Sequence, residues 1–221
     1  MKEKIINLSA KNRPYSSFFG PIHKFLVEKY TPLVSQYTET YVLTGLTLVW
    51  SGLVFLTGLL VTNRAGFFIA LASLIFLQFI TDIFDGAVGR FKNTGLIKWG
   101  FYADHFLDFI FCVSLIFAYT SFLAINKANL FLIFTLTLLF IAYELLMCLL
   151  NDGNLNANGY YGFGTIEMRF LFILMNLGLI FIELPNINKI IPFLLAPGFL
   201  FLFFQVWRTQ RQLWQEELKR K

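Results

Sequence analysis

The chain has 221 residues, of which 57% are hydrophobic and 14% are charged, against about 25% charged residues in soluble domains. A soluble fold of this size has no core large enough to bury so much apolar surface, whereas a lipid bilayer covers it from outside. The net charge of +5 does not indicate a nucleic-acid partner, because basic and aromatic side chains are not interleaved. Lys and Arg are instead typical anchors beside anionic membrane lipids. The composition therefore predicts an all-α integral membrane protein.

Residues 1–40 begin as a polar, basic stretch and then become amphipathic. Within them, residues 16–36 contain Pro21, a residue that suits the first turn of a helix. Phe25 and Tyr30 can form an apolar stripe further along. This pattern predicts a cytoplasmic segment that ends in a short interfacial helix on the membrane surface. A soluble helix that caps the bundle is the alternative interpretation.

The rest of the chain alternates long apolar stretches with polar turns. A membrane-spanning helix needs about 20 predominantly apolar residues, and six stretches meet that length. They form one predicted domain, residues 41–207, followed by a basic tail, residues 208–221, that continues the last helix. The predicted spans cover residues 41–61, 65–88, 99–124, 128–150, 166–184 and 189–207.

Basic residues fix the predicted orientation. They are concentrated before the first span, between the second and third, and after the last, whereas the three shortest loops hold only Arg64, Lys127 and Lys189. The positive-inside rule then predicts that both termini and the loop at residues 90–98 are cytoplasmic. We expect a multi-pass protein of a bacterial inner membrane, because the chain is short and rich in Lys, Asn, Phe and Ile.

Four aspartates stand where the second predicted span ends and the third begins. On each span the two aspartates are three or four residues apart, so they share one helical face. A glycine in phase with each pair lets another molecule approach the helix backbone closely. The two stripes consist of Asp82, Asp85 and Gly86 on the second span, and of Gly100, Asp104 and Asp108 on the third.

These carboxylates need partners, because an aspartate at the bilayer centre costs about 2.5–3.5 kcal/mol. A short loop joins the two spans, so we expect antiparallel neighbours whose acidic stripes face each other. Converging carboxylates repel unless cations lie between them, and oxygen-only ligands favour Mg²⁺ or Mn²⁺ over zinc or copper. The pattern predicts a site for two divalent ions that can clamp a pyrophosphate at the cytoplasmic membrane surface. A salt-bridge network at a helix corner is the structural alternative.

The same residues resemble the signature of the CDP-alcohol phosphotransferase family, whose members are also called CDP-alcohol phosphatidyltransferases. Its pattern is DxxDGxxAR, a short spacer, then GxxxDxxxD. Here Gly89 takes the place of the alanine, and the spacer is one residue longer. The resemblance implies an enzyme of phospholipid synthesis that moves a phospho-substituted group from a CDP-linked donor to an alcohol and releases CMP. The matching residues are Asp82, Asp85, Gly86, Arg90, Gly100, Asp104 and Asp108.

The resemblance also implies a role for each aspartate. Asp82, Asp85 and Asp104 would ligate the two divalent ions, Mg²⁺ or Mn²⁺. Asp108 would hold the second ion and act as the general base that takes the proton of the acceptor hydroxyl.

Five further residues are implied in donor binding. Gly86 would leave room for the cytidine nucleotide, Arg90 would contact the donor, and Gly100 would open the facing wall. Family members often carry a hydroxyl residue in the spacer and a threonine near the start of the first span. Thr94 and Thr44 are the candidates for these positions, although Thr94 is out of register and no Pro-Asn pair precedes Thr44.

The acceptor region is less well defined by the resemblance. His105 directly follows Asp104, and this DHxxD spelling resembles choline and ethanolamine phosphotransferases; packing away from the aspartates is the alternative. Glu167 and Arg169 open the fifth span, where relatives carry an acidic residue near the acceptor; an interfacial Glu–Arg anchor pair is the alternative. The donor stays open between CDP-diacylglycerol and a CDP-aminoalcohol, and the acceptor between phosphorylated polyols, serine and diacylglycerol. A homodimer is expected by the same resemblance.

Two other classes of membrane protein use acidic helices. An intramembrane prenyltransferase also holds a pyrophosphate with aspartates and Mg²⁺, but it typically has a second aspartate-rich motif, and none follows Asp108. A divalent-metal carrier usually places its ligands near the bilayer midplane in both halves of the chain. Here the aspartates lie in one half and toward one face, which favours the phosphotransferase.

Overall fold

The computed structural model describes residues 18–150, 165–182 and 186–219, and every regular element in these ranges is an α-helix. The predicted all-α class is confirmed for this part of the chain. Residues 1–17 of the predicted interfacial segment and residues 220–221 of the predicted tail lie outside the described residues. The helices are α1 (Gly20–Tyr37), α2 (Thr40–Leu60), α3 (Arg64–Phe91), α4 (Ile97–Phe122), α5 (Lys127–Leu150), α6 (Thr165–Leu179) and α7 (Ile187–Lys219).

In the described ranges, five helices are long and apolar enough to cross a membrane: α2, α3, α4, α5 and α7. Their length and composition indicate a multi-pass membrane protein. The fifth predicted span, residues 166–184, contains a shorter helix, because α6 has 15 residues. Such a helix is about 22 Å long at about 1.5 Å per residue, less than the hydrocarbon core of about 30 Å. A sixth crossing at α6 therefore stays a prediction, as does the cytoplasmic side of the termini.

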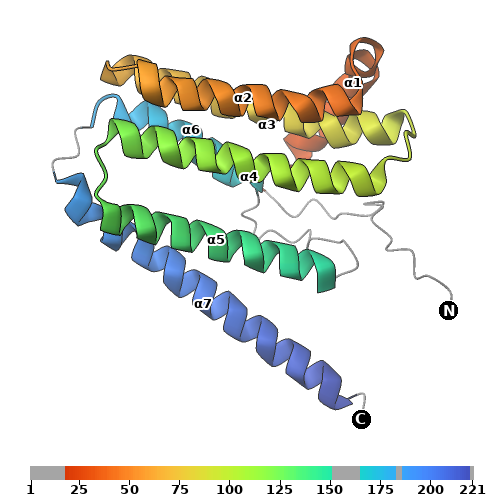
Figure 1. Cartoon of the computed structure of the whole chain (residues 1–221). Helices are drawn as coiled ribbons and strands as arrows, with labels where there is room; N and C mark the ends of the chain where they lie inside the picture. The colour runs from red at the N-terminus through yellow and green to blue at the C-terminus, as the bar shows by residue number, and fades with distance from the viewer. Residues whose placement is uncertain (1–17, 151–164, 183–185, 220–221) are drawn as a thin grey trace.

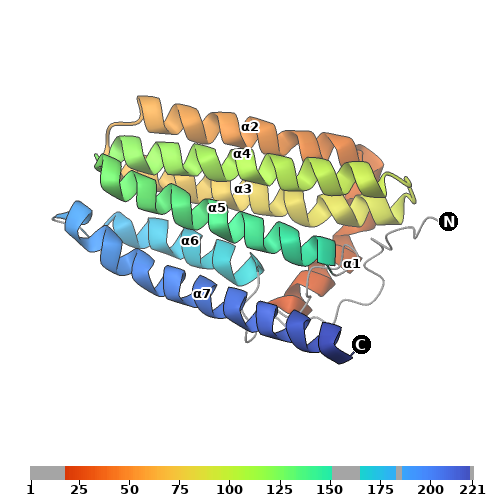
Figure 2. The same cartoon turned by 60° about the horizontal axis from the view of Figure 1, so that its bottom comes forward.

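The helices from α2 to α7 run roughly alongside one another and alternate in direction (Figure 1). α3 occupies the centre of one group, since it packs against α1, α2 and α6, and α2 also packs against α4. α5 and α7 pack on each other, and α5 makes a small additional contact with α4. α1 crosses this arrangement at the end where α3 is joined to α4 (Figure 2). All four aspartates belong to that end of α3 and α4.

α1 confirms the short helix predicted over residues 16–36, and Pro21 lies in its first turn. α7 confirms that the basic tail continues the last span, since one helix runs from Ile187 to Lys219 in spite of Pro192 and Pro197 inside it. The line drawn at residue 208 between domain and tail is therefore not marked by a break in secondary structure. The position of α1 relative to a membrane surface stays a prediction.

The main hydrophobic core joins α2, α3 and α4 at the end of the bundle away from the aspartates. Phe67 stacks on Phe122 with ring centroids 4.0 Å apart, and both α3 and α4 add further buried side chains. Gly58 allows α2 to approach α4 closely, because a Cβ atom at this position would lie 2.7 Å from Cα of Ala118. The buried members of the cluster are Val54, Phe67, Phe68, Leu71, Leu74, Ile75, Phe111 and Ala118.

Polar side chains fasten the short α6 to the other helices. The Arg64 guanidinium, at the start of α3, donates from Nε to the carbonyl of Leu179 at 2.8 Å and from Nη2 to the carbonyl of Ile182. In the middle of α6, Asn176 Oδ1 accepts from the Tyr119 hydroxyl of α4 at 2.9 Å. The carbonyls at the end of a helix carry partial negative charge, so the Arg64 cation beside them is stabilising. These contacts fix the position of α6 beside α3 and α4.

Candidate functional site

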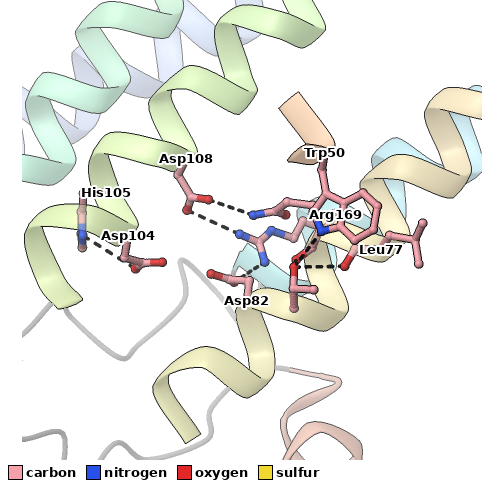
Figure 3. A network of polar contacts seen from close by, with 9 residues as sticks. Trp50, Leu77, Asp82, Asp104, His105, Asp108 and Arg169 are labelled. Carbon is pink, nitrogen blue, oxygen red and sulfur yellow. Dashed lines mark hydrogen bonds and ion pairs between the residues drawn. The ribbon is translucent and has the colours of Figure 1, made fainter. Parts of the chain in front are cut away.

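Three of the four aspartates meet between α3 and α4. Asp82, on α3, and Asp104 and Asp108, on α4, each offer a carboxylate oxygen, and these oxygens lie within 4.8 Å of one another. They meet because α3 and α4 run antiparallel on the same neighbour, α2, which packs against both, and because Asp104 and Asp108 are one helical turn apart on α4. The predicted convergence of the two acidic stripes is confirmed for these three residues (Figure 3).

Asp85 does not join this group. It lies three residues after Asp82, which turns its side chain by about 60° around α3 at about 100° per residue. That rotation brings it to α2, where Asp85 Oδ2 accepts a hydrogen bond of 2.7 Å from the hydroxyl of Thr44. Asp85 is 6% exposed, and its Oδ1 atom is buried with no hydrogen-bond partner among the described residues. Thr44 therefore holds the carboxylate of Asp85 from the neighbouring helix, and its predicted contact with a donor remains a prediction.

Arg169, in the first turns of α6, reaches into the group of carboxylates. Its Nη1 donates to Asp82 Oδ2, and its Nη2 lies 3.6 Å from Asp108 Oδ2. Figure 3 shows the guanidinium between these two aspartates. The sequence placed Arg169 near the acceptor, and the structure brings it to the predicted metal ligands themselves.

Glu167 points elsewhere than Arg169. Its Oε1 accepts a hydrogen bond of 3.0 Å from the backbone N–H of Phe19, directly before α1, and the residue is 5% exposed. An isolated Glu167–Arg169 anchor pair is therefore not what the structure shows. The first turns of α6 instead hold two partners, the start of α1 through Glu167 and the carboxylates through Arg169.

Gln78 is a site residue that the sequence analysis missed. Its Nε2 donates to Asp108 Oδ1 at 2.9 Å, and the side chain is 2% exposed. Gln78 lies four residues before Asp82 on the same face of α3, which is the signal that could have revealed it. Since Gln78 binds Oδ1, Asp108 is left with Oδ2 for the centre of the group.

The predicted donor-binding residues lie at the same end of the bundle. A Cβ atom added to Gly100 would meet nothing within 4 Å, so this position on α4 faces open space. Gly86 is exposed, and a Cβ atom there would lie 3.1 Å from Nη1 of Arg90, one turn further along α3. Thr94 Oγ1 is 3.5 Å from the carbonyl of Gly89 in the connection to α4. The two glycines and Arg90 therefore leave a surface that another molecule can approach.

His105 does not point into the group of carboxylates. Its Nδ1 lies 2.8 Å from the carbonyl of Phe101, one turn back on α4, and its ring packs on the Phe101 ring with centroids 4.2 Å apart. The same nitrogen is 3.8 Å from Asp104 Oδ2. This arrangement agrees with the interpretation of His105 as a packing residue beside the site, and its link to aminoalcohol chemistry stays a prediction.

The donor set fits a hard divalent cation. The clustered ligand atoms are all carboxylate oxygens, the atoms that Mg²⁺ and Mn²⁺ prefer in proteins. The unpartnered Oδ1 of Asp85 is a further buried oxygen whose negative charge needs a cation or a donor. Within the described residues, Arg169 is the cation paired with Asp82 and Asp108.

Fold and site together define a class: a multi-pass helical membrane protein with a cluster of carboxylates, capable of holding a cation, at one end of its helices. Comparison with protein-family models, with curated proteins and with solved structures finds no match to this chain.

Proposed function

We propose that this protein is a metal-dependent membrane enzyme that transfers a phospho-substituted group from a CDP-linked donor to an alcohol and releases CMP. The observation that carries the proposal is the meeting of Asp82, Asp104 and Asp108 from two antiparallel helices. These aspartates belong to the motif DxxDGxxxR…GxxxDxxxD, which resembles that of the CDP-alcohol phosphotransferases. A salt-bridge network alone gives no reason for the exposed Gly86 and the open Cβ position of Gly100 beside the same carboxylates.

Divalent ions, Mg²⁺ or Mn²⁺, would be held by Asp82, Asp104 and Asp108, with Asp85 contributing its free oxygen. When bound, they supply positive charge that neutralises a pyrophosphate and its leaving oxygen. Arg90 and the glycines at positions 86 and 100 would receive the donor at the open end of α3 and α4. The donor is proposed to be CDP-diacylglycerol or a CDP-aminoalcohol.

Asp108 would act as the general base. Gln78 fixes Oδ1 of Asp108 by a hydrogen bond of 2.9 Å, which orients Oδ2 toward the centre of the site. In the reaction, the acceptor oxygen forms a new bond to the phosphorus of the transferred group, and the bond from that phosphorus to CMP breaks. The proton of the acceptor hydroxyl passes to Oδ2 of Asp108, and the electron pair of the broken bond leaves with CMP. Positioned general bases contribute about 10²–10⁴-fold to rate.

The site is proposed to face the cytoplasm. The polar connection between α3 and α4 and the helix ends around it carry more Lys and Arg than the opposite connections, which is typical of cytoplasmic segments. A cytoplasmic site at the membrane surface gives a water-soluble nucleotide and a lipid access to the same carboxylates.

The test is CMP release by the full chain purified into nanodiscs. CDP-diacylglycerol, CDP-choline and CDP-ethanolamine are each offered with a panel of alcohols, with Mg²⁺, with Mn²⁺ and with EDTA. We expect release with one donor–acceptor pair, loss of release in EDTA, and a drop of at least about a hundredfold in Asp108→Asn. Glu144→Gln is the matched control, since it neutralises an acidic residue on α5, outside the carboxylate group. Metal-independent release, or full activity in Asp104→Asn and Asp108→Asn, would refute the proposal.

A further inference from the structure

Arg169 binds the oxygens that a metal ion needs. Gln78 donates to Oδ1 of Asp108, so Oδ2 is the oxygen left to face the group, and the Arg169 guanidinium lies 3.6 Å from it. On Asp82, Arg169 binds Oδ2 directly. A divalent ion coordinated by Asp82 and Asp108 would have to use these atoms or crowd against the guanidinium.

Arg169 also carries the counter-charge of the group. Buried carboxylates are costly without a cation nearby, and Arg169 supplies one to Asp82 and Asp108 in the described part of the chain. The Arg169 side chain is 20% exposed, so its own charge is largely removed from water and depends on these partners in return. A divalent ion would neutralise Asp82 and Asp108 in place of Arg169, and the guanidinium would lose its ionic partners.

The backbone of α6 does not depend on this contact. Arg64 binds the carbonyls at the far end of α6, and Asn176 binds Tyr119 in its middle. At the near end, Glu167 holds the start of α1 independently of Arg169. The Arg169 side chain can therefore swing away from the carboxylates while α6 keeps its place.

Resting on the metal site of the proposed function, we infer that Arg169 is an exchangeable internal counter-ion: it neutralises Asp82 and Asp108 in the metal-free protein and is displaced when a divalent cation binds. Arg169 thus acts on the site indirectly, as a positioning residue that holds the carboxylates of Asp82 and Asp108 in the metal-free protein. Metal affinity is set by the competition between guanidinium and cation for the same oxygens.

The first test measures binding of Mn²⁺ to the full chain in nanodiscs, from the electron paramagnetic resonance signal of free Mn²⁺. In Arg169→Ala we expect affinity to rise about tenfold, the change that corresponds to one modest ionic contact. Added guanidinium ion, at low non-denaturing concentration, should enter the space left by the side chain and bring the affinity back toward the wild-type value. Urea, which is similar in shape but neutral, and NaCl at matched ionic strength should not. Arg64→Ala is the matched control, because it removes the arginine at the other end of α6.

The second test uses the wild-type protein, so it does not depend on the folding of a variant. Saturating Mg²⁺ should shift the side-chain Nε–H resonance of Arg169 and leave that of Arg64 unchanged. An unchanged Arg169 resonance, or a guanidinium effect no larger than that of NaCl, would overturn the exchange.

The outcomes separate this inference from the proposed function. If Asp104→Asn abolishes binding of Mn²⁺ while Arg169→Ala leaves the affinity unchanged, the exchange is wrong and the metal site stands. If the wild-type protein binds no Mn²⁺ that Asp104→Asn abolishes, both the exchange and the metal-dependent function are refuted.

Discussion

Replacing Thr44 with valine is expected to destabilise the protein by about 2 kcal/mol. The Thr44 hydroxyl donates to Oδ2 of Asp85 at 2.7 Å, and both residues are buried, at 3% and 6% exposure. Hydrogen bonds to charged groups contribute about 1.5–3 kcal/mol, more than neutral ones. Because Asp85 Oδ1 has no partner among the described residues, the substitution leaves both oxygens of a buried carboxylate without a donor.

The free energy of unfolding is measured by reversible denaturation in mixed micelles, followed by tryptophan fluorescence, without divalent cations. Thr57→Val is the matched control on the same helix. The buried Thr57 hydroxyl donates to the Leu53 carbonyl at 2.8 Å, and the Thr44 hydroxyl oxygen likewise lies 3.0 Å from the carbonyl one turn before it, that of Thr40. The control should cost less than about 1 kcal/mol, as is usual for neutral hydrogen bonds in membrane helices. Thr44→Ser, which keeps the hydroxyl, should retain most of the stability. Equal losses in Thr44→Val and Thr57→Val would refute the role of Thr44 in holding Asp85.

Three further substitutions test the open surface beside the carboxylates, the close packing of α2 on α4, and the pH dependence of stability. Gly100→Ala should keep or slightly raise stability, because nothing lies within 4 Å of the added Cβ, but it should slow CMP release by about tenfold or more if the donor approaches there. Gly45→Ala is the control, since its Cβ position is equally open, and it should leave the rate of CMP release unchanged. Equal rates in the two variants would contradict the assigned donor surface. Gly58→Ala should cost about 1–3 kcal/mol of unfolding free energy, because its Cβ would lie 2.7 Å from Cα of Ala118, whereas Gly52→Ala should cost nothing; similar stabilities would show that α2 and α4 are not so close. Burial and the nearby positive charge of Arg90 lower the pKa of His23 below its ordinary value of about 6.5, against a smaller opposing effect of Asp82. The unfolded chain then binds the proton more readily, so stability should fall as the pH drops below about 6.5, and His23→Gln should weaken that dependence in pH-dependent unfolding; an identical pH profile would disprove it.

The helices could be predicted from the sequence because a bilayer imposes one rule on the whole chain. Each spanning helix must be apolar over a fixed length, so the limits of α2 and α5 follow closely from hydropathy. The end of α6 could not be predicted in this way, because the helix stops at Leu179, before the predicted span of residues 166–184 does. An apolar stretch shows that residues avoid water, and it does not show where their helix stops.

The acidic site could be predicted only as far as helical spacing reaches. The meeting of Asp82 with Asp104 and Asp108 followed from the period of an α-helix and from the short connection that makes α3 and α4 antiparallel. Asp85 turned to α2 because packing, not period, decides which neighbour each side of α3 faces. Arg169 is 87 residues away from Asp82 in the chain, and nothing in the local pattern indicated that α6 would pack on α3 beside the carboxylates.

The arginine contacts at the two ends of α6 limit how that helix tolerates a change in its length. Arg64 of α3 binds the last carbonyls of α6, and Arg169 of α6 binds the carboxylate of Asp82 on α3. The two contacts lie about ten residues apart on α6, and a slip of α6 along α3 by one turn of about 5.4 Å would make both impossible. Insertion or deletion of a single residue between Arg169 and Leu179 would rotate one end against the other by about 100°, so the length of α6 is constrained even where its side chains are exposed.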